Sequence, residues 1–154
     1  MNLISDLHIF GWQKENELKE ILESELNLTL TKTEDRYDTK DYITSEENHF
    51  AELKSRTQKY SRHEFSHWVI PTRKFWDLEK GQKMTVFYYW EQDNSLWKLE
   101  YDYKLFKTFN RGVPDWHYEV HFWIPAQLWQ RCNFQPSAQA WLGESEICNQ
   151  QILA

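Results

Sequence analysis

The sequence predicts an α/β domain in which helices flank a central β-sheet. Three observations predict this class: an amphipathic helical pattern opens the chain, strand patterns follow it, and a second helical segment separates them from further strands. The chain has 154 residues, which is enough for one domain to bury a core without disulfides or a structural metal. We therefore expect a single domain over residues 1–154.

The first expected helix covers residues 14–25, where Leu18, Ile21 and Leu22 form one apolar stripe among charged residues that favour helix. Short strand patterns follow this helix, because apolar and polar side chains then alternate. These strands are expected at residues 28–31, 41–44 and 49–54, with an exposed charged turn at 32–38.

The second expected helix follows a polar and basic stretch at residues 55–67. Pro71 suits the first turn of a helix over residues 72–80, and Gly81 can end it. A continuous β-branched and aromatic run then predicts the first strand of a hairpin. The remaining expected elements are strands at 84–90, 96–103 and 116–124 and a short helix at 125–130, whereas residues 131–154 carry no assignable pattern.

The composition is that of a folded protein. Aromatic residues make up 17% of the chain, with 9 Trp, whereas Gly and Pro number 4 each. The net charge of -6 argues against a uniformly basic nucleic-acid surface, although a local cationic groove is compatible with it.

Cysteine content and hydropathy address the cellular compartment. Cys132 and Cys148 are too few for a disulfide framework, so we expect two reduced thiols. The N-terminus lacks a signal-peptide pattern, and no segment approaches the about 20 apolar residues of a membrane span. These features predict a cytoplasmic protein with no membrane contact.

Three charged residues on two adjacent predicted strands carry the strongest chemical signal. Because side chains alternate along a strand, Glu52 and Lys54 share one face, while Ala51 and Leu53 turn to the apolar side. Asp41 opens the preceding strand. Paired carboxylates of this kind suit a hard cation such as Mg²⁺ and a phosphate substrate.

The element order and these residues together resemble the PD-(D/E)XK nuclease superfamily. Asp41 is followed after ten residues by Glu52-x-Lys54, and Lys40 stands where the family often has proline. The resemblance covers residues 12–103 and leaves 104–154 as a C-terminal extension. It implies a restriction-endonuclease-like core, a central mixed β-sheet flanked by helices in the order α-β-β-β-α-β, and Mg²⁺- or Mn²⁺-dependent cleavage of DNA. Small stand-alone members are often phage-encoded or act in repair and recombination, which would place this chain in a host cytoplasm.

The resemblance also implies residue roles. Asp41 and Glu52 would ligate the metal with the Leu53 carbonyl, and Lys54 would position the attacking water and stabilise transition-state charge. Asp35 and Asp38 compete with Asp41 and are otherwise solvated turn residues. Glu17 is a further candidate, since many members bring a glutamate from the first helix to the site; its alternative is a solvated helical glutamate.

The basic stretch after Lys54 is the expected DNA-binding surface, because phosphate contacts come from such side chains. A solvated basic loop is the alternative. The candidate phosphate contacts are Arg56, Lys59, Arg62, Arg73 and Lys74.

Other patterns receive structural interpretations. We read the four-residue spacings of the histidines as structural, with no zinc at either pair. The tryptophans could stack on bases, but aromatics at alternating strand positions are more typical of core. The two histidine pairs are His63/His67 and His117/His121. The aromatic residues at alternating strand positions are Phe87, Tyr89, Trp97 and Tyr101.

Two alternatives to a Mg²⁺-dependent deoxyribonuclease stay open. One is a catalytically inactive nuclease-fold domain that acts as a nucleic-acid or protein interaction module. The other is a Trp-rich ligand-binding protein with an unrelated acidic cluster. The sequence leaves the oligomeric state undecided, with a homodimer among the possibilities.

Overall fold

The computed structural model describes residues 3–33, 40–112 and 119–133 as a mixed α/β arrangement. A six-stranded sheet has the order β1-β2-β3-β5-β6-β8, and β4 pairs with β7 in a separate two-stranded sheet. The helices are α1 (Leu3–Glu17), α2 (Lys19–Leu26) and α3 (Tyr103–Lys107), with 3₁₀ turns η1 (Arg62–Glu64), η2 (Thr72–Phe75) and η3 (Ala126–Leu128). The strands are β1 (Leu30–Lys32), β2 (Tyr42–Thr44), β3 (His49–Arg56), β4 (His67–Pro71), β5 (Lys83–Trp90), β6 (Ser95–Glu100), β7 (His121–Pro125) and β8 (Gln130–Arg131).

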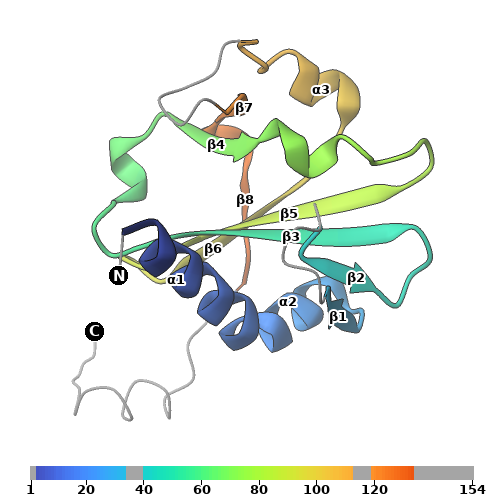
Figure 1. The fold of residues 1–154 in the computed structure, drawn as a ribbon, viewed down its shortest axis with the longest axis horizontal. Helices are drawn as coiled ribbons and strands as arrows, with labels where there is room; N and C mark the ends of the chain where they lie inside the picture. Colours follow the sequence, from blue (N-terminus) through green and yellow to red (C-terminus); the bar gives the residue numbers. More distant parts are fainter. Residues whose placement is uncertain (1–2, 34–39, 113–118, 134–154) are drawn as a thin grey trace.

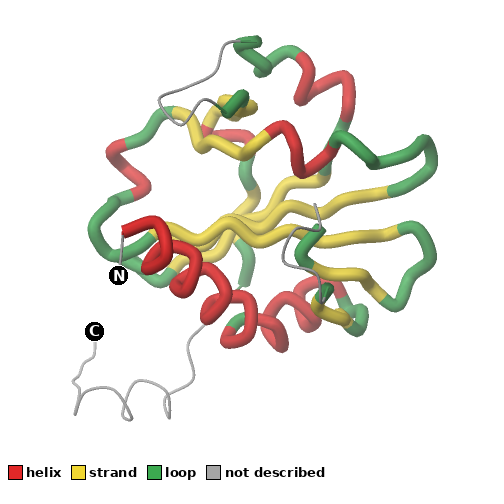
Figure 2. Tube along the Cα trace, in the orientation of Figure 1, coloured by secondary structure: helices red, strands yellow, loops and turns green. Residues whose placement is uncertain are grey.

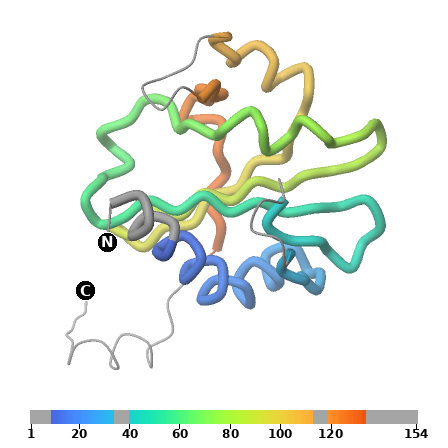
Figure 3. The backbone as a smooth tube through the Cα atoms, viewed as in Figure 1, coloured from blue at the N-terminus to red at the C-terminus, as the bar shows by residue number. Residues whose placement is uncertain are grey.

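The elements form three layers, with the six-stranded sheet in the middle. Helices α1 and α2 lie on one side of it, and β4, β7 and α3 lie on the other (Figures 1 and 2). Strands β1, β2 and β3 pair antiparallel, whereas β3 and β5 pair in parallel. A parallel pair requires a crossover, and the chain makes it through η1, β4 and η2 (Figure 3).

Each face of the central sheet has its own apolar cluster. The cluster on the α1 and α2 side is built from aliphatic and aromatic residues that include Leu22, Leu53 and Phe87. The cluster under β4 and β7 is dominated by large rings, among them Trp68, Trp90 and Phe106. Alternate residues of β3 and β5 therefore serve two different cores.

The expected helix over residues 72–80 is wrong. Only the 3₁₀ turn η2 forms, and the chain then continues through turns to Gly81, which has φ +91. Phe75 stacks on Tyr101 with ring centroids 4.4 Å apart, while Lys74 is directed to the carboxylates described below. These tertiary contacts override the local helix signal.

Other predicted elements are present, but some of their boundaries differ. The apolar stripe of the first helix is confirmed, since Leu18 and Leu22 are buried, but the helix is interrupted at Leu18 and starts earlier than residue 14. The β5–β6 hairpin is confirmed. Its second strand ends at Glu100 rather than at residue 103, because Asp102 caps α3 by accepting from the Leu105 N–H.

Near the C-terminal end of the described chain, the strand expected over 116–124 corresponds to β7, and residues 116–118 lie outside the described residues. The helix expected at 125–130 is the shorter 3₁₀ turn η3, followed by β8. Among the helices that the structure describes, none combines the length and the apolar character of a membrane span.

Candidate functional site

Asp41 and Glu52 lie side by side at the junction of β2 and β3. Tyr42 pairs with Ala51 in this antiparallel ladder, so Asp41 and Glu52 face each other one position further along. The Leu53 N–H donates to Asp41 Oδ2 at 2.9 Å. The hairpin backbone therefore holds the Asp41 carboxylate against β3.

Glu52 and Lys54 share one face of β3. Glu52 pairs with Val86 and Lys54 with Tyr88, both of which belong to the aromatic cluster under β4 and β7. Ala51 and Leu53 belong to the opposite cluster, as the alternation predicts.

Lys74 places a cation directly between the two carboxylates. Its Nζ lies 3.1 Å from Glu52 Oε2 and 3.7 Å from Asp41 Oδ1. Burial acts to lower the pKa of Lys74, but the charges of Glu52 and Asp41 outweigh it and raise that pKa. Lys74, which we expected among the phosphate contacts, is thus an internal ion-pair partner of the site.

Glu52 is the most deeply buried carboxylate of this group, with 5% of its side chain exposed. Burial first and Asp41 second raise the pKa of Glu52 well above its ordinary value, although Lys74 opposes both. Its Oε1 has no hydrogen-bond partner among the described residues. An orphaned buried oxygen next to a second carboxylate is a donor set that fits a hard divalent cation.

The described side chains of this cluster offer a metal ion two carboxylates, those of Asp41 and Glu52. Within the ranges that the structure describes, no group of three or more His, Cys, Asp or Glu side chains gathers as a metal site. Further ligands to a cation at Asp41 and Glu52 would be carbonyl oxygens or water, which is how Mg²⁺ is commonly held.

Lys54 differs from Lys74 in its surroundings. Burial lowers the pKa of Lys54 to about 8, the Arg56 charge acts in the same direction, and Glu52 opposes both. We find no ion pair of Lys54 with a carboxylate in the described part of the chain. A partly buried lysine with a lowered pKa and no fixed partner is suited to meeting charge on a substrate.

The α1 carboxylate nearest Asp41 belongs to Glu15. Burial first, and the Asp41 charge second, raise the pKa of Glu15 to about 7. The Tyr42 hydroxyl donates to the Glu15 backbone carbonyl, which docks α1 beside the start of β2. Glu17, which the resemblance suggested, is instead 58% exposed and pairs with Lys14 at 3.0 Å.

Sequence reasoning missed Glu15, although a signal for it exists. Glu15 precedes Leu18 by three residues and Leu22 by seven, so it continues the stripe of the two buried leucines. Glu17 lies one turn before Ile21, which is only partly buried. Choosing Glu15 over Glu17 required knowing which part of the apolar stripe is most deeply buried, and the sequence does not show this.

Most of the predicted phosphate contacts are already engaged. Arg62 Nε lies 2.6 Å from Asp93 Oδ2, and Arg73 Nε lies 2.5 Å from Glu119 Oε2. Arg56 Nε donates to the Tyr88 hydroxyl at 3.1 Å. Lys59 is exposed, with its Nζ 5.8 Å from the Tyr60 ring centroid.

The remaining candidates are the competing aspartates and the histidine pairs. Asp35, Asp38 and His117 fall outside the described residues. His63 is exposed on η1, and His67 Nδ1 contacts Ser66 Oγ at 2.9 Å. The structure therefore brings together Asp41, Glu52, Lys54 and Lys74, with Glu15 close by.

Three comparisons with known proteins were made for this chain. The scan against protein-family models and the searches of curated proteins and of solved structures return no match.

Proposed function

We propose that this protein is a Mg²⁺- or Mn²⁺-dependent deoxyribonuclease of the PD-(D/E)XK type. One observation carries the proposal: Asp41 lies next to Glu52 across the β2–β3 ladder, and Lys54 shares the Glu52 face of β3. Two carboxylates and an unengaged lysine within one partly buried cluster are the groups that metal-assisted phosphodiester hydrolysis requires.

The strand order gives further support. A helix, an antiparallel trio of strands and a strand parallel to the third follow one another, which matches the restriction-endonuclease-like order α-β-β-β-α-β except at its second helix. One feature departs from that order, since the crossover between β3 and β5 carries β4 and two 3₁₀ turns in place of a helix.

Each residue would have a separate task in the reaction. Asp41 and Glu52 would hold the divalent ion, which supplies Lewis-acid polarisation of a phosphate oxygen and a more acidic water. Lys54 would hydrogen-bond the attacking water and offset the negative charge that develops on the phosphate. Lys74, displaced from the carboxylates, would lie close enough to neutralise the same phosphate.

Plasmid cleavage tests this proposal. The wild type should nick or linearise DNA with Mg²⁺ or Mn²⁺ and not with EDTA, whereas Asp41→Asn and Glu52→Gln should lose both cleavage and Mn²⁺ binding by calorimetry. Glu47→Gln is the matched control, because Glu47 is an exposed carboxylate in the same hairpin. Full cleavage by the Glu52→Gln variant would refute the assignment.

One observation favours the non-catalytic alternative, an interaction module on the same fold. Lys74 forms ion pairs with both Asp41 and Glu52, so the cluster contains a counter-ion of its own. On this alternative the protein would bind nucleic acid without turnover, and Mn²⁺ would show no binding that depends on Asp41.

A further inference from the structure

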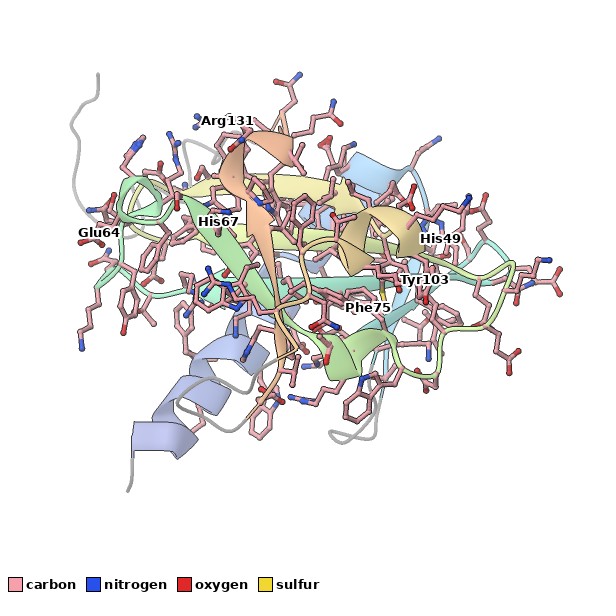
Figure 4. The ribbon with its side chains drawn as sticks, turned by 90° about the horizontal axis from the view of Figure 1, so that it is seen from above. His49, Glu64, His67, Phe75, Tyr103 and Arg131 are labelled. Carbon is pink, nitrogen blue, oxygen red and sulfur yellow. The ribbon has the colours of Figure 1, made fainter. Side chains whose placement is uncertain are left out.

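A hollow of about 680 Å³ lies on the same side of the sheet as the carboxylate cluster. Figure 4 shows Glu64, His67 and Arg131 toward the end of the molecule that the hollow occupies, with His49 toward the other end. The residues that line it include Arg62, Glu64, Phe65, Trp68, Trp97 and Trp129.

Aromatic rings form the wall of this hollow. Trp68 meets both Trp97 and Trp129 with ring centroids 5.4 Å apart. Trp68 and Trp129 are almost fully buried, whereas Phe65 is 37% exposed. The indole N–H of Trp97 donates to Ser95 Oγ at 2.9 Å, which fixes the orientation of its ring. The wall is therefore a rigid surface for a flat apolar ligand.

Two of these rings also carry unused donors. The Nε1 atoms of Trp68 and Trp129 are buried and lack a hydrogen-bond partner within the described ranges. Such donors normally find an acceptor, because leaving one unsatisfied costs about 1–3 kcal/mol. Because both Nε1 atoms are shielded in this structure, the contact that the wall offers to a ligand is ring stacking and not a hydrogen bond from these indoles.

Guanidinium groups border the same rings. The Cζ atoms of Arg62 and Arg131 lie 5.1 Å and 5.4 Å from the Trp97 ring centroid. The carboxylate of Glu64 is engaged in capping η1, where it accepts from the Ser61 N–H at 2.9 Å. Aromatic surface with flanking arginines is the combination that binds single-stranded nucleic acid.

The hollow continues the line of charged residues on β3. Arg56 follows Glu52 by four residues on the same face, which is about 13 Å at the rise of a strand. Its Cζ lies 5.9 Å from the Tyr60 ring, and Tyr60 contacts Phe65 in the hollow at 6.0 Å. Arg56 therefore lies between the carboxylate cluster and the hollow, on the same face of β3 as Glu52.

We propose that this hollow binds an unpaired base of a single-stranded nucleic acid whose backbone passes Arg56 toward the Asp41–Glu52 cluster. The proposal rests on the proposed function for the direction of the strand, and it deepens that function by naming the substrate class. A duplex keeps its bases stacked and paired, so single-stranded DNA or a frayed end is the preferred ligand.

The test measures binding of a fluorescent oligo(dT) and of a duplex of equal length by polarisation, in EDTA so that no cleavage occurs. The wild type should bind the single strand more tightly. Trp97→Leu should weaken single-strand binding about tenfold, because base stacking on an aromatic side chain is worth about 1–3 kcal/mol. An abasic oligonucleotide should bind the wild type as weakly as oligo(dT) binds the variant.

Trp123→Leu is the matched control, since Trp123 is also partly buried and carries Arg111 3.9 Å above its ring, away from the hollow. It should leave binding unchanged. If Trp97→Leu is poorly folded, Arg131→Gln replaces it, with Arg111→Gln as its control. Arg131 is exposed on β8, and its loss should reduce the salt slope for the single strand by about 0.7.

Three results would overturn the inference: no binding of oligo(dT), equal affinity for the abasic strand, or equal losses in the hollow variants and their controls. If the protein binds oligo(dT) through Trp97 but does not cleave DNA, the binding proposal for the hollow stands and the nuclease proposal is refuted. If single-stranded DNA is bound and cleaved equally well after Trp97→Leu, the hollow is refuted and the nuclease proposal stands.

Discussion

The two faces of the central sheet are built from alternate residues of the same strands, yet they differ in chemistry. The face beneath α1 and α2 carries Leu53 and Phe87 in an apolar cluster. The face beneath β4 and β7 carries Glu52 and Lys54 next to large aromatic rings.

The difference shows where this fold tolerates buried charge. Regular helices cover the apolar face, whereas an irregular crossover with 3₁₀ turns covers the charged face and brings Lys74 to the carboxylates. Burial disfavours the charged forms of Glu52 and Lys54, as the raised pKa of the one and the lowered pKa of the other indicate. Both faces therefore bury an apolar core, and the face under β4 and β7 also carries reactive groups at some expense of stability.

The largest effect is expected on the apolar face. Phe87→Ala should lower the free energy of unfolding by about 3–5 kcal/mol, because a fully buried ring leaves a cavity. Urea denaturation measures this change, with Tyr103→Ala as an exposed control that should shift stability by less than about 0.5 kcal/mol. A loss below 1 kcal/mol for Phe87→Ala would mean that the ring is not packed in a close-fitting core on this face.

The next effect concerns catalysis on the charged face. Lys54→Met should reduce the cleavage rate on the order of 10²-fold or more while Mn²⁺ and oligonucleotide affinities stay close to wild type, since only transition-state stabilisation is removed. Single-turnover cleavage and calorimetry separate the two readouts. Wild-type rates in this variant would reduce Lys54 to a structural residue.

A smaller effect separates the two lysines of that face. Lys74→Met should raise Mn²⁺ affinity about tenfold, because the ammonium group competes for Asp41 and Glu52 and a coupling of this size is about 1.4 kcal/mol. Lys83→Met provides the control, since Lys83 is 59% exposed and pairs with Glu46. Weaker Mn²⁺ binding after Lys74→Met would show that the lysine organises the carboxylates instead of competing with a cation.

The smallest effect is a pH dependence in EDTA. The pKa of Lys54 is about 8 in the folded protein and about 10.4 for a free lysine, so between these values the unfolded chain holds a proton that the native protein has released. Stability relative to Lys54→Met should therefore rise with pH, by about 1 kcal/mol between pH 8 and 9. Parallel curves for the two proteins would place Lys54 in a solvent-like environment.

The sequence was sufficient for the strands that pair locally. Period-two alternation placed Ala51 and Leu53 opposite Glu52 and Lys54, and the run ending at Trp90 located the hairpin. Local patterns of this kind depend on neighbouring residues alone, so they can be read without an alignment.

Residues whose position depends on distant packing could not be predicted. Lys74 was predicted as a phosphate contact because it belongs to the basic stretch after Lys54, whereas packing of Phe75 on Tyr101 and Phe106 accompanies a 3₁₀ turn from which Lys74 reaches the carboxylates. Glu15 was passed over because the sequence does not reveal how deeply each part of a helix stripe is buried.

The parallel pairing of β3 with β5 also has a kinetic consequence. Every partner pair, from His49 with Lys83 to Arg56 with Trp90, is 34 residues apart in the chain. Closing such a loop is entropically slow compared with forming the adjacent β5–β6 hairpin. Asp41 and Glu52 face each other across the local β2–β3 hairpin, whereas Lys74 belongs to the crossover between β3 and β5, so we expect the two carboxylates to come together before their counter-ion during refolding.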